Sequence, residues 1–199
     1  MKKKNGNLLS NILTVIGVGG ILIGGGILGT TLWGEYNRGV ETREFVKQAE
    51  VLTQQEMLIS RAEFDPEAGD VVGLIFFPKF DVRVALIEGM RDSDLHAGIG
   101  HEPLTGWPTD ERQIFLAGHR NTEFGILKDI EIGDIVEMRM KYGTYTYKIT
   151  GTKIVDAGAV DEIKPYESFE NDQLVLMTCY PFTFGADTVD RFLVFAERA

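Results

Sequence analysis

The sequence predicts a mainly β fold, an eight-stranded β-barrel with short helices, preceded by one N-terminal transmembrane helix. Beyond Val71 the chain consists of short apolar runs rich in Val, Ile, Phe and Tyr, separated by Gly, Pro and Asp. Eight such runs in about 130 residues are typical of an antiparallel barrel or sandwich. Ahead of them, residues 5–34 contain no charged side chain, and a run of that length can cross a bilayer as one helix.

The N-terminal run is expected to be an uncleaved membrane anchor at residues 8–34. Three consecutive lysines precede it, and the positive-inside rule then places residues 1–7 in the cytoplasm and the rest of the chain outside the cell membrane. Trp33 and Tyr36 fall at the far interface, where aromatic rings anchor a helix. A cleaved signal peptide is the alternative. It is disfavoured because the apolar run is longer than a usual signal core and its end lacks a convincing A-x-A site.

Residues 35–70 are expected to form an amphipathic helix and an acidic linker. Between residues 41 and 59, apolar side chains recur at helical spacing, so one face of a helix could dock on the folded domain or serve as a stalk. Such a helix could also occlude a site on that domain. The stretch 61–70 is acidic and contains Pro66 and Gly69, which is typical of a linker. The apolar face consists of Phe45, Val46, Ala49 and Leu52.

Residues 71–199 are expected to form the folded domain. The clearest strand lies in "GTYTYKIT", where Tyr145 and Tyr147 alternate with threonines, as a strand with one buried face requires. One helical interruption is expected in "NTEFGILKDIEIGD", with Asn121 or Thr122 as its N-cap. The predicted strands are "VVGLIFF", "VRVALIEG", "RQIFLAG", "GDIVEMRM", "TYTYKIT", "TKIV", "QLVLMT" and "RFLVFA".

The charge and the cysteine content narrow the possible functions. All 30 acidic residues lie after Gly34, whereas three of the 20 basic residues precede it, so residues 35–199 carry a formal charge of −13. An acidic domain of this kind repels nucleic acid, and no nucleic-acid partner is expected. The single cysteine, Cys179, excludes an internal disulfide. An unpaired thiol in such a chain is a buried apolar side chain, an intermolecular bridge or a reactive group.

Three side chains together have the chemistry of thiol-dependent acyl transfer. That reaction needs a nucleophile, an acid that protonates the leaving amine, and donors that hold the oxyanion. Cys179 ends the apolar strand in "LVLMTCYPF", and His119 follows another strand in "FLAGHRN". Arg191 begins the last strand, "RFLVFA". Because all three lie at strand ends, a thiol, an imidazole and a guanidinium could converge on one edge of the barrel.

These motifs, in this order, resemble the sortase family of cysteine transpeptidases. The matching residues are "AGHR" at 117–120, "LMTC" at 176–179 and "DRFLVFA" at 190–196, together with the N-terminal anchor. The resemblance covers residues 71–199 and implies a sortase-like β-barrel. One departure is Val175, which stands first in the family's Thr-Leu-x-Thr-Cys pattern. A β-branched residue suits a strand at this position, so no effect on catalysis is expected.

Within the family, the sequence most resembles class D. The pattern "TCYPF" and the single N-terminal anchor carry this likeness. Pilin-polymerising class C members usually add a C-terminal transmembrane helix and a lid with an Asp-Pro-aromatic motif. Here Asp65 and Pro66 are followed by Glu67 instead of an aromatic residue. This difference disfavours class C, and a pilin-polymerising sortase is the alternative interpretation.

The resemblance implies a membrane-held transpeptidase that acts outside a Gram-positive cell without a metal or other cofactor. Its partners would be an amine of the cell-wall precursor and secreted proteins with C-terminal LPxTG-like sorting signals, or LPNTA-like signals as in some class D members. Cys179 would attack the Thr carbonyl, and His119 would protonate the leaving amine. Arg191 would donate to the oxyanion or to carbonyls of the signal. Arg120 and Arg198 are alternative oxyanion donors.

The substrate groove is expected beside the nucleophile. It would be built from the loop before the cysteine strand, residues 156–172, and from the strand itself, because the Leu and Pro of a signal need an apolar pocket. The candidate substrate-binding residues are Ala157, Val160, Ile163, Val175, Met177, Thr178 and Tyr180.

Two other interpretations have less support. A zinc site would need His96 and His101 to join His119, but histidines five residues apart in a glycine-rich loop are not a usual ligand pair, so no metal is expected. His101 is instead expected to pack beneath the active-site loop. A non-catalytic β-domain that binds an envelope partner is the alternative of a different class. A degenerate copy of this kind would be expected to lose Cys179, His119 or Arg191, and all three are present.

Overall fold

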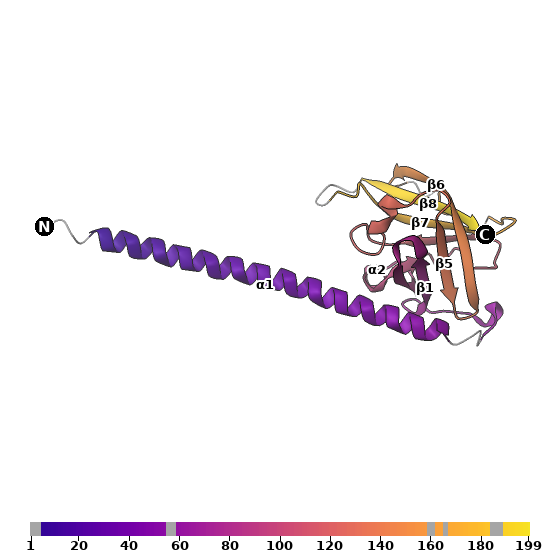
Figure 1. The fold of residues 1–199 in the computed structure, drawn as a ribbon, viewed down its shortest axis with the longest axis horizontal. Helices are drawn as coiled ribbons and strands as arrows, with labels where there is room; N and C mark the ends of the chain where they lie inside the picture. Colours follow the sequence, from indigo (N-terminus) through magenta and orange to yellow (C-terminus); the bar gives the residue numbers. More distant parts are fainter. Residues whose placement is uncertain (1–4, 55–58, 159–161, 165–166, 184–188) are drawn as a thin grey trace. The chain divides into compact units, whose positions relative to one another are not determined.

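The folded domain is a closed barrel of eight strands, as predicted. The computed structural model describes residues 5–54, 59–158, 162–164, 167–183 and 189–199 (Figure 1). Around the barrel the strands follow the order β1-β2-β3-β4-β7-β8-β6-β5. Their bounds are β1 Val71–Phe77, β2 Val82–Glu88, β3 Ile99–His101, β4 Gln113–Ala117, β5 Ile135–Met140, β6 Gly143–Asp156, β7 Gln173–Tyr180 and β8 Asp190–Arg198.

Strand β7 lies between β4 and β8. It pairs in parallel with β4 and antiparallel with β8. A parallel pair needs a long crossover connection, and between β4 and β7 the chain forms the β5–β6 hairpin, which closes the barrel against β1 and β8. Figure 1 shows β6, β8 and β7 side by side.

Alternate residues of each strand fill the barrel interior, as the period of a β-strand requires. On β7, Leu174 and Leu176 belong to the main core, whereas Val175 belongs to a separate cluster. On β8, Val194 belongs to the main core and Leu193 to the separate cluster. The parity of a residue therefore decides whether its side chain points into the barrel or onto its outer face.

Two strands differ from the prediction. β6 is one strand of 14 residues where the sequence predicted two. It continues past Gly151 because β8 pairs with it on both sides of an irregularity between Ile149 and Gly151. The three-residue β3 was not predicted, because its short glycine-containing segment "IGH" shows no alternation of polar and apolar residues.

The N-terminal segment is a single helix, α1 (Asn5–Gln54). The sequence predicted an anchor followed by a separate amphipathic helix, but the segment contains no proline that would interrupt a helix between them. Among the residues that the structure describes, no helix has both the length and the apolar character needed to cross a membrane. Residues 1–7 lie partly outside the described residues. The chain divides into two compact units, Met1–Glu41 and Thr42–Ala199.

The last turns of α1 pack on β1 and β2 within the second unit. Ala49 is fully buried there, in a cluster with Leu74 of β1, Ala85 of β2 and Ala97 of the short helix α2 (Asp92–Ala97). The predicted amphipathic face therefore docks on the barrel. This cluster contains none of the three predicted catalytic residues. Its contacts from α1 are Phe45, Val46, Ala49 and Leu52.

The predicted acidic linker is in part packed against the barrel. It contains a 3₁₀ helix, η1 (Arg61–Glu63), followed by Phe64, which is only 6% exposed. The Phe64 ring lies 5.2 Å from that of Trp107 and 5.0 Å from that of Tyr142, measured between centroids. The packed domain therefore begins before Val71.

The predicted helix at residues 121–134 is a shorter 3₁₀ helix, η3 (Gly125–Asp129). Neither Asn121 nor Thr122 caps it, because the preceding residues form a turn in which the Phe124 N–H donates to the His119 carbonyl at 3.0 Å. Phe124 is fully buried, and its ring centroid lies 6.4 Å from that of Phe77. This aromatic side chain anchors the loop that carries His119.

Replacing Phe124 with alanine should lower the free energy of unfolding by about 3–5 kcal/mol, because a buried ring is lost and a cavity remains. Denaturant unfolding followed by tryptophan fluorescence measures the change. Ile132→Ala is the control: that side chain is 73% exposed, and its loss should change stability by less than about 0.5 kcal/mol. Equal effects of the two substitutions would show that Phe124 does not anchor this loop.

Candidate active site

The register of β7 brings the three predicted catalytic residues together. The last residues paired between β4 and β7 are Ala117 and Met177. His119 and Cys179 each lie two residues beyond that pair, and therefore at the same level of two neighbouring chain segments. On the other side of β7, Cys179 lies directly opposite Arg191 of β8. Directly opposite residues on antiparallel strands have Cβ atoms about 4.5–5.5 Å apart.

The site lies on the outer face of the barrel. Leu176 and Thr178 of β7 are 0% and 2% exposed and face the interior. Cys179 alternates with them, so its thiol points outward. The side chains of Cys179, His119 and Arg191 are each half-buried, which leaves them in reach of a ligand on that face.

Three hydrogen bonds tie the His119 loop to the end of β7. The Gly118 N–H donates to the Met177 carbonyl at 3.1 Å, and the Thr178 hydroxyl donates to the Gly118 carbonyl at 2.8 Å. The Arg120 Nη1 donates to the Pro181 carbonyl. Because these bonds lie on both sides of His119 and Cys179, they fix the separation of imidazole and thiol.

Within the described structure, the imidazole of His119 has an unpaired nitrogen and a ring neighbour. Its Nε2 atom is buried and has no hydrogen-bond partner among the described residues. Its backbone carbonyl is held by the N–H groups of Thr122 and Phe124, at 3.4 and 3.0 Å. The ring of His96 lies edge to face with it, with centroids 5.7 Å apart and planes at 79°. A buried polar atom without a partner is rare, and a catalytic role is one of its explanations.

Arg191 is the arginine best placed beside the thiol. Its Nη1 donates to the carbonyl of Asp190 at 3.0 Å, and its five N–H donors suit an oxyanion or a peptide carbonyl. The two alternatives have other positions: Arg120 binds the Pro181 carbonyl, and Arg198 lies 3.4 Å from the buried Asp172 carboxylate. Neither of those two stands opposite Cys179 in the β7–β8 ladder.

An apolar surface adjoins the thiol. We call it the outer-face cluster. Met177 is the next outward residue from Cys179 along β7 and packs on this cluster, as does Ile163 from the loop between β6 and β7. Apolar side chains therefore lie next to Cys179 on the outer face of the barrel. The buried members of the cluster are Phe115, Val175 and Leu193, and its partly buried members are Met90, Val155, Ile163, Met177 and Phe195.

Gln113 holds the loop against this cluster and was missed from the sequence. Its side chain is 2% exposed. The Nε2 atom donates to the Glu162 carbonyl at 3.1 Å, and the Oε1 atom accepts from the Lys164 N–H at 2.6 Å. Ile163 is thereby fixed between two bonds. The sequence feature that could have indicated this role is the amide side chain of Gln113 at the start of the otherwise apolar strand β4.

The predicted substrate-binding residues fall into different environments. Ile163 and Met177 border the outer-face cluster, and Val175 is buried in it. Thr178 faces the interior, where its hydroxyl binds Gly118, so it positions the site and does not line the groove. Ala157 is exposed.

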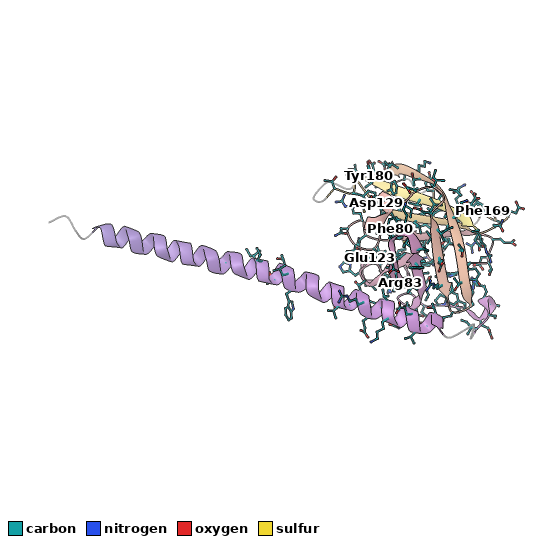
Figure 2. All side chains as sticks on the ribbon, in the orientation of Figure 1. Phe80, Arg83, Glu123, Asp129, Phe169 and Tyr180 are labelled. Carbon is teal, nitrogen blue, oxygen red and sulfur yellow. The ribbon has the colours of Figure 1, made fainter. Side chains whose placement is uncertain are left out.

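Tyr180, labelled in Figure 2, stacks on Phe192 with ring centroids 6.4 Å apart, at the end of β7. Val160 lies outside the described residues. Ala157 follows the end of β6, and neither Ala157 nor Tyr180 belongs to the outer-face cluster, so the structure does not place these two predicted residues beside it.

His101 is a packing residue, as expected. It is fully buried, with Nδ1 2.8 Å from a carboxylate oxygen of Glu88 and Nε2 3.0 Å from the carbonyl of Gly106. Its ring stacks on Trp107 at 3.7 Å between centroids. Within the described part of the chain, no three His, Cys, Asp or Glu side chains come together as a metal site.

Helix α2, which carries His96, is held by a buried carboxylate. Asp94 is 3% exposed and accepts hydrogen bonds from the backbone N–H, Nε and Nη2 of Arg91, each at 2.9 Å. These bonds close the first turn of the helix. The orientation of α2 therefore depends on the ionised form of Asp94.

Comparison with known proteins identifies the family of the chain. A family model described as a sortase domain matches residues 75–199. Sortase D of Bacillus subtilis (strain 168) is 34% identical over 139 residues, which cover 70% of this chain and 69% of that protein. A solved sortase D5 transpeptidase of Clostridium perfringens has a TM-score of 0.67 at 20% identity, covering 80% of this chain and 99% of the other. A Clostridium perfringens sortase C, solved with the C-terminal cell wall sorting motif, has a TM-score of 0.58 at 23% identity, covering 80% and 88%.

The chain therefore belongs to the sortase family, and it is a cysteine transpeptidase. The predicted resemblance to class D is confirmed by the similarity to Sortase D. At their low identity, the two solved structures support the fold alone.

The Asp94 carboxylate should stabilise α2 only when it is ionised. Hydrogen bonds from the Arg91 side chain hold the pKa of Asp94 below its ordinary value. A carboxylate with a depressed pKa in the folded state contributes stability above its unfolded pKa and loses it as the pH falls through the folded pKa. Asp94→Asn should therefore lower the unfolding free energy by about 1–3 kcal/mol at pH 7, and the difference should shrink below about pH 4.

Denaturant unfolding of both proteins at neutral and acidic pH measures this difference. Asp92→Asn, an exposed position in the same helix turn, is the control and should change stability little at either pH. A loss in Asp94→Asn that is the same at both pH values would contradict the role given to the charge.

Proposed function

We propose that this sortase cleaves an LPxTG-like sorting signal, with LPNTA-like signals as a variant, between Thr and the following residue. It then transfers the secreted protein that carries the signal to an amine of the cell-wall precursor. The observation that supports this most directly is the placement of Cys179 opposite Arg191, with His119 at the same level. These are the nucleophile, the oxyanion donor and the proton donor that thiol-dependent acyl transfer requires.

The first half of the reaction forms a thioacyl enzyme. The Cys179 sulfur, as thiolate, attacks the Thr carbonyl carbon, and the carbonyl oxygen becomes an oxyanion that accepts from the Arg191 guanidinium. As the tetrahedral intermediate collapses, the C–N bond breaks. The leaving amine takes a proton from the imidazolium of His119.

The second half reverses these roles with a different amine. The acceptor amine attacks the thioacyl carbon, and His119, now neutral, takes its proton. The C–S bond then breaks, and Cys179 leaves as thiolate. A new amide bond replaces the one that was cleaved, so the transfer needs neither an oxidant nor a metal.

The outer-face cluster supports an apolar signal as the substrate. Leu and Pro of the signal need a surface that excludes water. Met177, the next outward residue from Cys179 on β7, and Ile163 of the preceding loop both pack on the outer-face cluster. Gln113 keeps Ile163 in place. The segment that carries Ile163 is thus ordered before substrate binds, which reduces the ordering cost of binding.

Membrane attachment is the second part of the proposal. The uncharged run at residues 5–34, after three lysines, supports an anchor at 8–34 that holds the catalytic domain outside the cell membrane. Sedimentation of the full chain with membranes after an alkaline carbonate wash is expected. Release of the chain by that wash would contradict the anchor.

The catalytic roles predict losses of peptide-cleavage activity that differ in size between variants. Cleavage is measured on the full chain in detergent, with quenched LPxTG, LPNTA and scrambled peptides. Cys179→Ala should abolish cleavage and the thioacyl adduct seen by intact mass. His119→Ala should lower kcat by about 10²–10⁴-fold. Arg191→Ala should lower it by about 10²–10³-fold, and Arg191→Lys by less, since the charge is kept but the fork of donors is lost.

Arg83→Ala is the matched control, because this arginine lies on β2 and pairs with Asp81 at 2.9 Å, away from the three strand ends. It should retain parental turnover. Cleavage that persists in Cys179→Ala would contradict the mechanism. So would a parental chain that forms no adduct with any of the peptides although its thiol reacts with a small alkylating reagent.

A further inference from the structure

We propose that His96 is a positioning residue for His119, and that its ring holds the catalytic imidazole in the orientation needed for proton transfer. The inference rests on the proposed function of His119 as the acid and base of the transfer. It gives His96, an exposed residue outside the three motifs, a role in the same reaction.

The contact between the two rings has the geometry of a favourable aromatic pair. Their centroids are 5.7 Å apart and their planes meet at 79°. Aromatic rings prefer such edge-to-face arrangements at separations of about 4.5–7 Å, because the positive edge of one ring meets the negative face of the other. The His119 ring therefore has a preferred orientation against His96.

The orientation of the His119 ring is not set by a hydrogen bond to Nε2 within the described residues. A catalytic histidine is commonly held by a third side chain that accepts a hydrogen bond from its second nitrogen. In the described part of the chain, the buried Nε2 of His119 has no hydrogen-bond partner, and the ring instead packs edge to face on the ring of His96. The backbone of His119 is fixed by Phe124 and Thr122, but these bonds leave the side-chain torsions free. The ring contact supplies the missing restraint.

Helix α2 is a firm support for His96. Its first turn is closed by the bonds between Arg91 and Asp94. Ala97, the next residue after His96, packs in the cluster that contains Ala49 of α1. At the end of the helix, Gly98 fits tightly, since a Cβ atom there would lie 2.3 Å from the Ala85 carbonyl oxygen. Because this segment is held in place, the His96 ring can restrict the orientation of the His119 ring.

The position of His96 makes the idea testable without loss of the fold, because the side chain is exposed. His96→Ala removes the ring, and His96→Phe keeps a ring of similar shape. Asp92→Ala, an exposed residue of the same helix, is the control. All variants are made in the full chain, in detergent, and their unfolding midpoints should match that of the parent.

The kinetic result expected is a loss in kcat and not in KM. His96→Ala should lower kcat for the quenched LPxTG peptide by about 5- to 20-fold with KM unchanged, because a misoriented acid slows the chemical step. His96→Phe should restore kcat to within about twofold of the parent, and Asp92→Ala should not differ from it. A parental kcat in His96→Ala, or a loss in His96→Phe as large as in His96→Ala, would overturn the proposal.

An NMR measurement tests the contact independently of activity. The chain has three histidines, so the imidazole C–H signals can be assigned from single substitutions. His96→Ala should shift the His119 signals, which lose the ring current of their neighbour, and His96→Phe should keep them displaced. A His119 spectrum that does not change in His96→Ala overturns the proposal even if turnover changes. A parental enzyme that shows no turnover of any sorting peptide but does show these shifts contradicts the proposed function and leaves the ring contact established.

Discussion

The active site depends on one constraint, the register of β7 between β4 and β8. A shift of one residue in a β-ladder moves every side chain to the opposite face of the sheet. In this barrel such a shift would turn Cys179 into the interior and bring Thr178 to the outside. The observed pairing of Met177 with Ala117 and of Cys179 with Arg191 therefore brings together the three residues that we propose to be catalytic.

The rest of the domain stabilises that register or uses it. Alternating core residues on β4, β7 and β8 fill the interior and would be exposed by a slip. Asp172, buried just before β7, accepts hydrogen bonds from the N–H groups of Thr109 and Glu111 at 2.7 and 2.8 Å, and so joins the start of β7 to the loop before β4. At the other end, Thr178 and Arg120 bind the His119 loop. Strands β4 and β7 are thus held together at both ends. Their outward-facing residues form the thiol site and the apolar surface beside it.

Much of this fold could be predicted because period-2 patterns and turn residues are local signals. The β-barrel and most of its strands followed from short stretches of sequence, as did the three candidate catalytic positions. Features that depend on distant partners did not. The continuity of β6 through Gly151 comes from its pairing with β8, and β3 has too few residues to show a period.

Side-chain roles were hardest to predict where one residue type has several uses. Thr178 looked like a groove residue, yet its parity places the hydroxyl inside, where it binds Gly118. Gln113 binds a loop that is far from it in sequence, and His96 meets His119 only through the placement of α2.

The most direct test of the register is disulfide formation between Cys179 and a cysteine introduced at position 191, since directly opposite residues have the Cα separation that a disulfide needs. In the full chain under mild oxidation, the Arg191→Cys variant should lose both free thiols, and its intact mass should fall by two hydrogens. The Phe192→Cys variant, with its cysteine one residue along and on the opposite face, should keep both thiols. A disulfide in Phe192→Cys and not in Arg191→Cys would contradict the register and the site built on it.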